Sequence, residues 1–307
     1  MENNIYDLAI LGAGPAGICA AIYATRAKLN TIWLDRKFVQ GGQIVDTYEV
    51  DNYPGLPGIT GLDLGEAMAG HAEKLGLKPK REPVLSVTDE GEIKVIRTKK
   101  NEYHARAVII ACGATHRHLG IPGEEELGGM GVSYCATCDA AFFQEGTVAV
   151  VGGGNVAVED AILLSRTCKK VYLVHRRDEL RAEKILQDSL FACRNVELVW
   201  DSVPLAVEGE DKVTALKVRN VKTDEEKEIS VDGVFIAVGI VPGSGKFKDL
   251  VKMDESGYII AGEDGVTSTP GIFAAGDIRT KNLRQVVTAV ADGANAVASV
   301  QRYLMEY

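Results

Sequence analysis

The stretch Asp7-Leu8-Ala9-Ile10-Leu11-Gly12-Ala13-Gly14-Pro15-Ala16-Gly17 decides the fold of this chain. Its apolar run up to Leu11 is typical of a buried parallel strand, and residues 18–27 behind it predict a helix. A second strand, 31–34, ends on Asp35. Strand, glycine turn, helix, strand and terminal acid together form a dinucleotide-binding fingerprint. The glycines let a pyrophosphate approach the helix N-terminus, and Asp35 suits the ribose hydroxyls.

The same pattern returns in the middle of the chain. A strand at 147–151 runs into Gly152-Gly153-Gly154-Asn155-Val156-Ala157, and a helix at 158–165 and a strand at 170–174 follow, the latter ending on His175. From first glycine to terminal residue there are 35 − 12 = 23 positions in the first unit and 175 − 152 = 23 in the second. The chain therefore contains two nucleotide-binding units in the same register.

The two units differ at the terminal residue. Where the first has an acid, the second has His175-Arg176-Arg177, with Arg181 one helical turn further on. An acid suits a bare ribose diol, whereas arginines suit a 2′-phosphate, so the second unit is expected to prefer NADPH over NADH. The alternative is a solvated basic start of a helix, because Asp178, Glu179 and Glu183 share the stretch.

The segment before the second unit reads Ser133-Tyr134-Cys135-Ala136-Thr137-Cys138-Asp139. One or two helical turns are expected over 135–143, with the cysteines at the N-terminal end, where the helix dipole favours a thiolate. Two cysteines at this spacing can close a small disulfide, and Asp139 is placed to handle the proton. The alternative is a pair of small buried residues. A zinc site is not favoured, because His116 and His118 complete no standard ligand spacing.

The remaining segments complete an α/β chain. Further strands are predicted at 84–87, 93–96, 107–111, 213–221, 227–231, 233–239 and 269–277, and further helices at 62–75 and 283–307. The last helix has Val287, Val290, Ala291, Ala294 and Val297 on one apolar face, which needs the first unit as a partner surface. We therefore expect two Rossmann-like dinucleotide-binding domains, the second (116–244) inserted into a discontinuous first (1–115 and 245–307).

Composition narrows the classes of function. The 307 residues carry a net charge of −9, which argues against nucleic acid or an anionic membrane as the main partner. The N-terminus lacks the basic region of a signal peptide, and there is no run of about 18 apolar residues to span a membrane. Six cysteines make no disulfide framework, so a reducing cytoplasm is expected. Cysteines 19, 112, 168 and 193 have no partner at motif spacing and are expected to be structural.

Two dinucleotide sites with a cysteine pair between them indicate an electron path. NADPH at the arginine-bearing site is the expected donor. The first site is expected to hold a cofactor that accepts a hydride, and FAD does this and uses the same fingerprint. The cysteine pair is the next acceptor in line.

A series of motifs runs along the whole chain. In order, they are GAGPAG at 12–17, GGQ at 41–43, NYPG at 52–55, CATCD at 135–139, GGGNVA at 152–157, HRRDELR at 175–181 and AAGD at 274–277, followed by Arg284-Gln285. Together they resemble the low-molecular-weight thioredoxin reductases, class II of the FAD/NADPH pyridine nucleotide-disulfide oxidoreductases. The resemblance implies a homodimeric flavoprotein that uses NADPH to reduce the disulfide of thioredoxin.

Carried over to this sequence, the resemblance implies FAD contacts at Gly12, Gly14, Pro15, Ala16, Gly17, Asp35, Gly42, Gln43, Asn52, Gly276, Asp277, Arg284, Gln285 and Val286. It implies NADPH contacts at Gly152, Gly154, Asn155, Ala157, His175, Arg176, Arg177 and Arg181. Cys138 resembles the flavin-proximal cysteine, Cys135 the cysteine that attacks the protein disulfide, and Asp139 the acid/base. One domain of family members rotates against the other, which here implies hinges near 115–123 and 240–245. Asp35 stands where a glutamate is common, which shortens its reach by a methylene.

Two rival functions stay open from the sequence. The first is an enzyme of the same build that reduces another electron partner, such as a glutaredoxin-like protein, or that oxidises a small dithiol with oxygen. A nucleotide-sensing binding protein would keep the two folds without chemistry. The CxxC-Asp segment argues against the sensor, because a sensor has no use for a dithiol beside a flavin.

Overall fold

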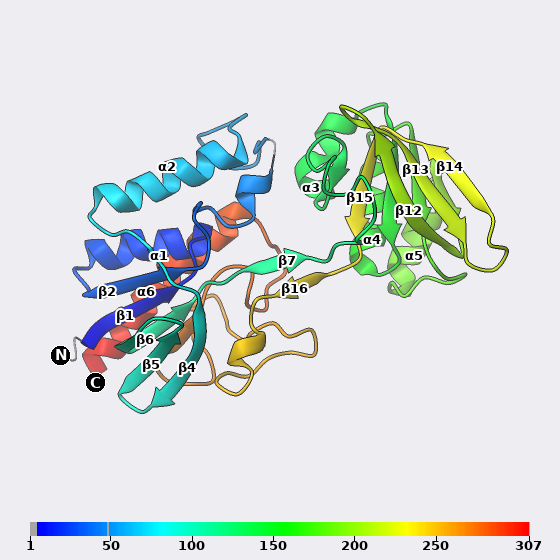
Figure 1. Ribbon diagram of the computed structural model, residues 1–307. Helices are drawn as coiled ribbons and strands as arrows, with labels where there is room; N and C mark the ends of the chain where they lie inside the picture. The colour runs from blue at the N-terminus through cyan, green and yellow to red at the C-terminus, as the bar shows by residue number, and fades with distance from the viewer. Residues whose placement is uncertain (1–4, 48, 307) are drawn as a thin grey trace. The chain divides into compact units, whose positions relative to one another are not determined.

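The computed structural model describes residues 5–47 and 49–306 and divides the chain into two compact units (Figure 1). Unit 1 comprises Met1–Thr115 and Val241–Tyr307, and unit 2 comprises His116–Ile240. Because both ends of the chain build unit 1, unit 2 is an insertion into it. Residues 1–4 of the predicted N-terminus and Tyr307 of the last predicted helix lie outside the described residues.

Unit 1 contains a sheet in the order β3-β2-β1-β6-β5-β4, with β17 also pairing with β6. Its strands are β1 (Ile5–Leu11), β2 (Thr31–Asp35), β3 (Lys80–Arg81), β4 (Val84–Glu90), β5 (Ile93–Thr98), β6 (Glu102–Ile110) and β17 (Ile272–Ala274). The pairings around β1 and the β17–β6 pair are parallel, whereas β4, β5 and β6 pair antiparallel. The carboxyl ends of β1, β2, β6 and β17 therefore meet at one edge, where a doubly wound sheet binds its ligand.

Three helices of unit 1 pack on one face of this sheet. They are α1 (Pro15–Arg26), α2 (Gly61–Lys74) and α6 (Val286–Glu306), and α1 contacts both others. Alternation along β1 explains the two cores, because successive side chains of a strand point to opposite faces. Leu8 and Ile10 lie in the core beneath the helices, and Ala9 and Leu11 in a second core with Phe247 and Ile259.

Unit 2 is built on a parallel sheet in the order β11-β10-β9-β15-β8. The strands of this sheet are β8 (Val132–Ser133), β9 (Thr147–Gly152), β10 (Lys170–Val174), β11 (Val196–Val199) and β15 (Gly233–Ala237). A separate antiparallel sheet contains β12 (Ser202–Gly209), β13 (Val213–Asn220) and β14 (Glu226–Ser230). The helices are α3 (Ala136–Asp139), α4 (Asn155–Leu164) and α5 (Lys184–Phe191). One core forms under α4 and α5, and the other between the two sheets.

Two short strands form the connections between the units. β7 (Ala114–His116) leads out of unit 1, β16 (Ile240–Pro242) leads back, and the two pair with each other. β16 lies within the stretch predicted as a hinge at 240–245, and β7 overlaps the start of the one predicted at 115–123. The remaining elements are the short 3-10 helices η1 (Ile44–Asp46), η2 (Ala140–Phe143) and η3 (Gly245–Phe247). Among the described helices, none combines the length and the apolar character needed to cross a membrane.

The predicted fold class is confirmed, and three local predictions are wrong. Residues 175–183 contain no helical turn, because the Arg181 N–H donates to Gly153 O at 2.8 Å instead of continuing a helix. The strand expected over 269–277 is confined to β17. The predicted apolar face of the last helix is only partly right: Val297 lies in the core, but Val287 is 43 % exposed, and Asp292, Gly293 and Ser299 are buried instead. The buried face of α6 packs closely on α1. This packing favours small side chains such as Gly293, and the one buried acid, Asp292, is hydrogen-bonded.

Candidate functional site

The cysteine pair is closed as the Cys135–Cys138 disulfide in unit 2. Cys135 is the N-cap residue of α3, and η2 follows directly, which confirms the helical turns expected over 135–143. The Cys135 Sγ accepts the Cys138 N–H at 3.2 Å, and the Cys135 carbonyl accepts the N–H of Asp139 at 3.1 Å. Backbone donors therefore converge on the first cysteine.

Asp139 is held beside the disulfide by Ser133, a residue of β8. The Ser133 hydroxyl donates to Asp139 Oδ2 at 2.5 Å, and the Cys135 N–H donates to the same hydroxyl at 3.0 Å. Burial raises the pKa of the Asp139 carboxyl, and the hydrogen bond from Ser133 acts in the opposite direction. A carboxyl of raised pKa next to a disulfide is suited to exchange a proton with a thiol.

A second cluster of polar side chains comes from residues that precede Cys135 in the chain. The Tyr134 hydroxyl donates to Glu124 Oε1 at 2.7 Å, and the His118 ring lies edge-on to the Tyr134 ring. Glu124 is only 1 % exposed, yet the hydrogen bonds from Tyr134 and from backbone N–H groups outweigh burial and hold its pKa below the usual range. These contacts fix the chain just before the disulfide.

The first glycine loop of unit 1 lies where the carboxyl ends of the parallel strands meet. Gly14 is the N-cap residue of α1 without a side-chain cap, and Pro15 is the first helical residue. Gly17 is required by close approach, because a Cβ there would lie 2.0 Å from Gly12 O. Asp35 ends β2, and burial raises the pKa of its carboxyl. This is the arrangement that the fingerprint predicts for a dinucleotide pyrophosphate and its ribose.

Segments far apart in sequence meet at this loop. The backbone of Gly42 lies against Gly14, and that of Gly276 lies against Ala16. Asn52 Nδ2 donates to Gln285 Oε1 at 3.0 Å across 233 positions of sequence. Elsewhere in the unit, Gln43 Nε2 donates to Ala114 O, and Val286 is the first residue of α6.

Two buried polar groups of unit 1 are left unsatisfied. Asp277 Oδ1 and Arg284 Nε have no hydrogen-bond partner in the part of the chain that the structure describes. Burial raises the pKa of Asp277, and the nearest ammonium, Lys281 Nζ, lies 3.9 Å from its Oδ1, beyond hydrogen-bond distance. The Arg284 guanidinium lies over the Tyr258 ring at 4.0 Å. Buried polar atoms are normally paired, so these two indicate a ligand with polar groups of its own.

The second glycine loop, in unit 2, is supported by contacts from His175 and Glu183. A Cβ on Gly153 would lie 2.2 Å from the His175 ring, so that ring packs directly on the loop backbone. Asn155 and Glu183 exchange two hydrogen bonds, of 3.1 and 2.9 Å. Gly152 ends β9, Gly154 is the N-cap residue of α4 and Ala157 is buried in that helix.

The arginines beside this loop are free to bind an anion. Arg176, Arg177 and Arg181 are all exposed, and no carboxylate of the described residues pairs with them. His175 differs from them, because it is buried, and burial lowers the pKa of its ring. Three unpaired guanidinium groups beside a dinucleotide loop suit a phosphate.

Family comparison agrees with this combination of two glycine loops and a disulfide. The model of the pyridine nucleotide-disulphide oxidoreductases matches residues 6–293. The chain belongs to that family.

Individual relatives within the pyridine nucleotide-disulphide oxidoreductases match over nearly the full length. Thioredoxin reductases of Listeria innocua and Bacillus subtilis are 48 % and 47 % identical, with 99 % of this chain and 96 % of each relative covered. The solved thioredoxin reductase of Streptococcus pyogenes is 46 % identical with a TM-score of 0.95, and both chains are covered completely. That of Lactococcus lactis, described as in the FR conformation, is 44 % identical with a TM-score of 0.67 over 98 % of this chain and 100 % of its own.

Several residues that brace the site were not anticipated from the sequence. Ser133, Glu124, Tyr258 and Asp292 support predicted site residues through contacts that no local pattern encodes. Only Asp292 carries a signal in the sequence, because it is an acid on the helix face that small residues such as Gly293 and Ala296 share.

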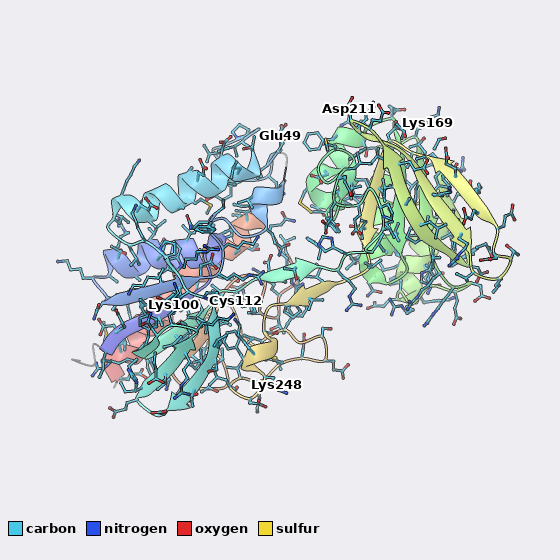
Figure 2. The ribbon with its side chains drawn as sticks, in the orientation of Figure 1. Glu49, Lys100, Cys112, Lys169, Asp211 and Lys248 are labelled. Atoms are coloured by element: carbon cyan, nitrogen blue, oxygen red, sulfur yellow. A yellow bond between two sulfur atoms is a disulfide. The ribbon has the colours of Figure 1, made fainter. Side chains whose placement is uncertain are left out.

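The four other cysteines are free thiols, as expected of structural residues. Burial raises the pKa of Cys19 and of Cys112 to about 11, and it also raises the pKa of Cys168. Cys112, labelled in Figure 2, follows β6, and its Sγ donates to Leu11 O at 3.4 Å. A protonated thiol is a poor nucleophile, so Cys19, Cys112 and Cys168 are not suited to attack a disulfide.

Proposed function

We propose that this protein is a thioredoxin reductase that moves two electrons from NADPH, by way of FAD, to the Cys135–Cys138 disulfide and from there to oxidised thioredoxin. The observation that carries the proposal is this disulfide with Asp139 beside it, on the same unit as the second glycine loop and its three unpaired arginines. The full-length relatives named thioredoxin reductase support it.

The residues of unit 1 fit FAD. Asp277 Oδ1 and Arg284 Nε are buried polar atoms that a bound ligand would satisfy, and the Gly12–Gly17 loop leaves the start of α1 uncapped for a pyrophosphate. We assign FAD to Gly12, Gly14, Pro15, Ala16, Gly17, Asp35, Gly42, Gln43, Asn52, Gly276, Asp277, Arg284, Gln285 and Val286. When bound, FAD accepts the hydride of NADPH and supplies two electrons to a disulfide.

We assign NADPH to unit 2. Gly152, Gly154, Asn155 and Ala157 would hold the pyrophosphate at the start of α4. Arg176, Arg177 and Arg181 would bind the 2′-phosphate. His175 would act indirectly, because its ring packs on the loop backbone at Gly153.

The chain's own residues carry out the disulfide exchange. Reduction breaks the Cys135–Cys138 bond and leaves both sulfurs as thiol or thiolate, with Cys138 as the sulfur that takes the electrons. The Cys135 thiolate then attacks the thioredoxin disulfide and forms a mixed disulfide. Cys138 attacks Cys135 Sγ, which restores the internal disulfide and releases dithiol thioredoxin. Asp139 accepts a proton from one thiol and returns it to the departing thiolate.

The cysteine pair must meet two different partners in turn. The chain passes between the two units at β7 and at β16, and we propose that one unit rotates about these strands so that the disulfide is reduced in one orientation and meets thioredoxin in the other. We further propose that the protein is cytoplasmic, since a cycling dithiol needs a reducing compartment. We also propose that it is a homodimer, as the family resemblance implies. Light scattering should then give twice the chain mass of 32.9 kDa.

Anaerobic titration of the yellow protein tests the electron path. NADPH should bleach the flavin, and excess oxidised thioredoxin should restore the colour with one NADPH consumed per disulfide reduced. A flavin that NADPH does not reduce contradicts the assignment of unit 2. In a separate aerobic assay, oxygen consumption without thioredoxin reduction would identify an oxidase instead.

Serine variants test whether each cysteine is required. In Cys138→Ser the flavin should still be reduced by NADPH while thioredoxin turnover is lost, because the acceptor of the flavin electrons is gone. In Cys135→Ser turnover should also be lost. Turnover of thioredoxin by Cys138→Ser at the wild-type rate would refute the scheme.

A further inference from the structure

The hydroxyl of Ser133 touches both working parts of the redox segment. Ser133 is the second residue of β8, where it pairs in parallel with Phe235 of β15, and it is only 5 % exposed. Its oxygen accepts the Cys135 N–H at 3.0 Å and its proton is donated to Asp139 Oδ2 at 2.5 Å. One buried hydroxyl therefore connects the sheet, the first cysteine and the carboxyl.

The direction of these bonds follows from the single proton of a serine hydroxyl. The alternative acceptor, Cys135 O, lies at 3.4 Å, so the proton is committed to the much shorter contact with Asp139. The N–H received from Cys135 polarises the hydroxyl and strengthens the bond that it donates. A second link runs from the Asp139 N–H to Cys135 O at 3.1 Å. The backbone of Asp139 is thus bonded directly to Cys135, and its carboxyl is linked to Cys135 through Ser133.

Few other groups around Asp139 can stabilise the charge of its carboxylate. Burial acts to raise the pKa of the carboxyl, and the Ser133 hydrogen bond acts to lower it. The helix α4, which packs on α3, contributes the titratable groups Glu159 and Asp160, which are acids and not counter-charges. η2 and the paired strand β15 contain no titratable side chain.

We propose that Ser133 is a positioning residue for the disulfide exchange: its hydroxyl anchors the Asp139 carboxyl to β8 beside the Cys135–Cys138 disulfide and stabilises the carboxylate form. The anchor stays in place when the disulfide opens, because neither of its bonds involves a sulfur atom. The inference rests on the proposed function, since the proton transfer by Asp139 is part of that proposal.

The test measures the titration of Asp139 directly in the FAD-loaded, oxidised protein. The ¹³C signal of its side-chain carboxyl is followed against pH in protein labelled at aspartate and is assigned by its loss in Asp139→Asn. In Ser133→Ala the apparent pKa should rise by about one pH unit, because the carboxylate loses its hydrogen bond. Ser133→Thr keeps the hydroxyl and should restore the wild-type titration.

Ser202→Ala is the matched control. Ser202 is also 5 % exposed and lies in unit 2, and its hydroxyl donates to a backbone carbonyl, Trp200 O, at 2.7 Å. Its removal should leave the Asp139 titration unchanged. A titration that does not move in Ser133→Ala, or that moves equally in Ser202→Ala, overturns the inference.

Turnover supplies the second reading. The pH dependence of kcat for thioredoxin reduction should shift in Ser133→Ala in the same direction as the titration and return in Ser133→Thr. A shifted titration with a wild-type pH profile overturns the positioning role. Failure of the wild-type protein to reduce thioredoxin would refute the proposed function, whereas the titration would still decide whether Ser133 controls the carboxyl.

Discussion

The buried carboxylate of Asp292 should be worth several kilocalories per mole to the stability of unit 1. Asp292 lies on α6 and accepts hydrogen bonds from Arg279 Nη2 at 2.6 Å, Arg279 Nε at 2.9 Å, Lys281 Nζ at 2.9 Å and the Gly276 N–H at 2.9 Å. The side chains of Arg279, Lys281 and Asp292 are each 6 % exposed. Replacement by asparagine keeps the shape and leaves two buried cations without their carboxylate.

The magnitude follows from burial. Removing one partner of a buried ion pair costs about 3–5 kcal/mol, because the remaining charge has neither water nor a counter-ion. The matched control is Glu102→Gln, which breaks the Arg97–Glu102 pair of 2.8 Å in the same unit, with side chains 48 % and 45 % exposed. An exposed pair of this kind is worth at most about 1 kcal/mol.

Urea unfolding of the apoprotein measures both variants without a contribution from FAD binding. Trp33 reports on unit 1, because it is 1 % exposed and its indole N–H donates to Gly12 O; the second tryptophan, Trp200, is removed by Trp200→Phe. With a slope of about 2–3 kcal/mol per M, the midpoint should fall by about 1–2.5 M in Asp292→Asn. In Glu102→Gln it should fall by less than about 0.5 M.

A midpoint that falls no further in Asp292→Asn than in Glu102→Gln would refute the reasoning. The same variant should also bind FAD more weakly, because the Gly276 N–H that precedes Asp277 loses its charged acceptor.

Three further outcomes are expected. Gly17→Ala should lower the amount of FAD that the protein retains, because its Cβ would lie 2.0 Å from a backbone oxygen. Gly70 has open space around it, so Gly70→Ala should leave FAD retention unchanged and raise the free energy of unfolding by about 0.5–1 kcal/mol. Equal FAD retention by the two variants would contradict the geometry. The double variant Arg176→Ala/Arg177→Ala should lower kcat/KM for NADPH by about 10- to 100-fold and leave that for NADH unchanged, and equal use of both by the wild type would count against this. Burial raises the pKa of Asp277, so protonation favours the folded state: this contribution is present below the unfolded value of 3.8 and is lost as the pH rises through the folded pKa. Asp277→Asn apoprotein should therefore be more stable than wild type at pH 7 and lose this advantage towards pH 4, while its FAD affinity falls; a less stable variant at pH 7 would contradict the sign.

Strand-turn-helix segments were predictable because their signals are local. The apolar run before Gly12, the glycine spacing and the acid at Asp35 lie within thirty residues, and the second unit repeats them in the same register. Periodicity and turn chemistry report the backbone conformation of such a window directly. For the same reason the two-unit architecture and the Cys135–Cys138 pair could be recognised without coordinates.

The short strands escaped detection because their partners are distant. β3 and β8 have two residues each and were not predicted, and the strand predicted over 269–277 is reduced to β17, which pairs with β6, more than 160 positions earlier. A two-residue strand has no periodicity of its own and exists only because a neighbour supplies its hydrogen bonds. The helical turn expected between Arg177 and Arg181 is absent, since the Arg181 N–H donates to Gly153 O, an acceptor outside the segment.

The sequence alone determined which chemistry this chain carries: two dinucleotide loops, a cysteine pair with an adjacent acid, and the arginines at 176, 177 and 181 beside the second loop. The tertiary structure decided which side chains hold that chemistry in place. Ser133 reaches Asp139, Asp292 reaches Gly276, and Asn52 meets Gln285 only after folding. Even the buried face of α6 was set by its partner, because close packing on α1 requires a glycine at position 293, where a Cβ would lie 2.2 Å from Ala16 O. A sequence pattern records the conformation and polarity of each segment, whereas the partner of a buried side chain depends on which segments the fold brings together.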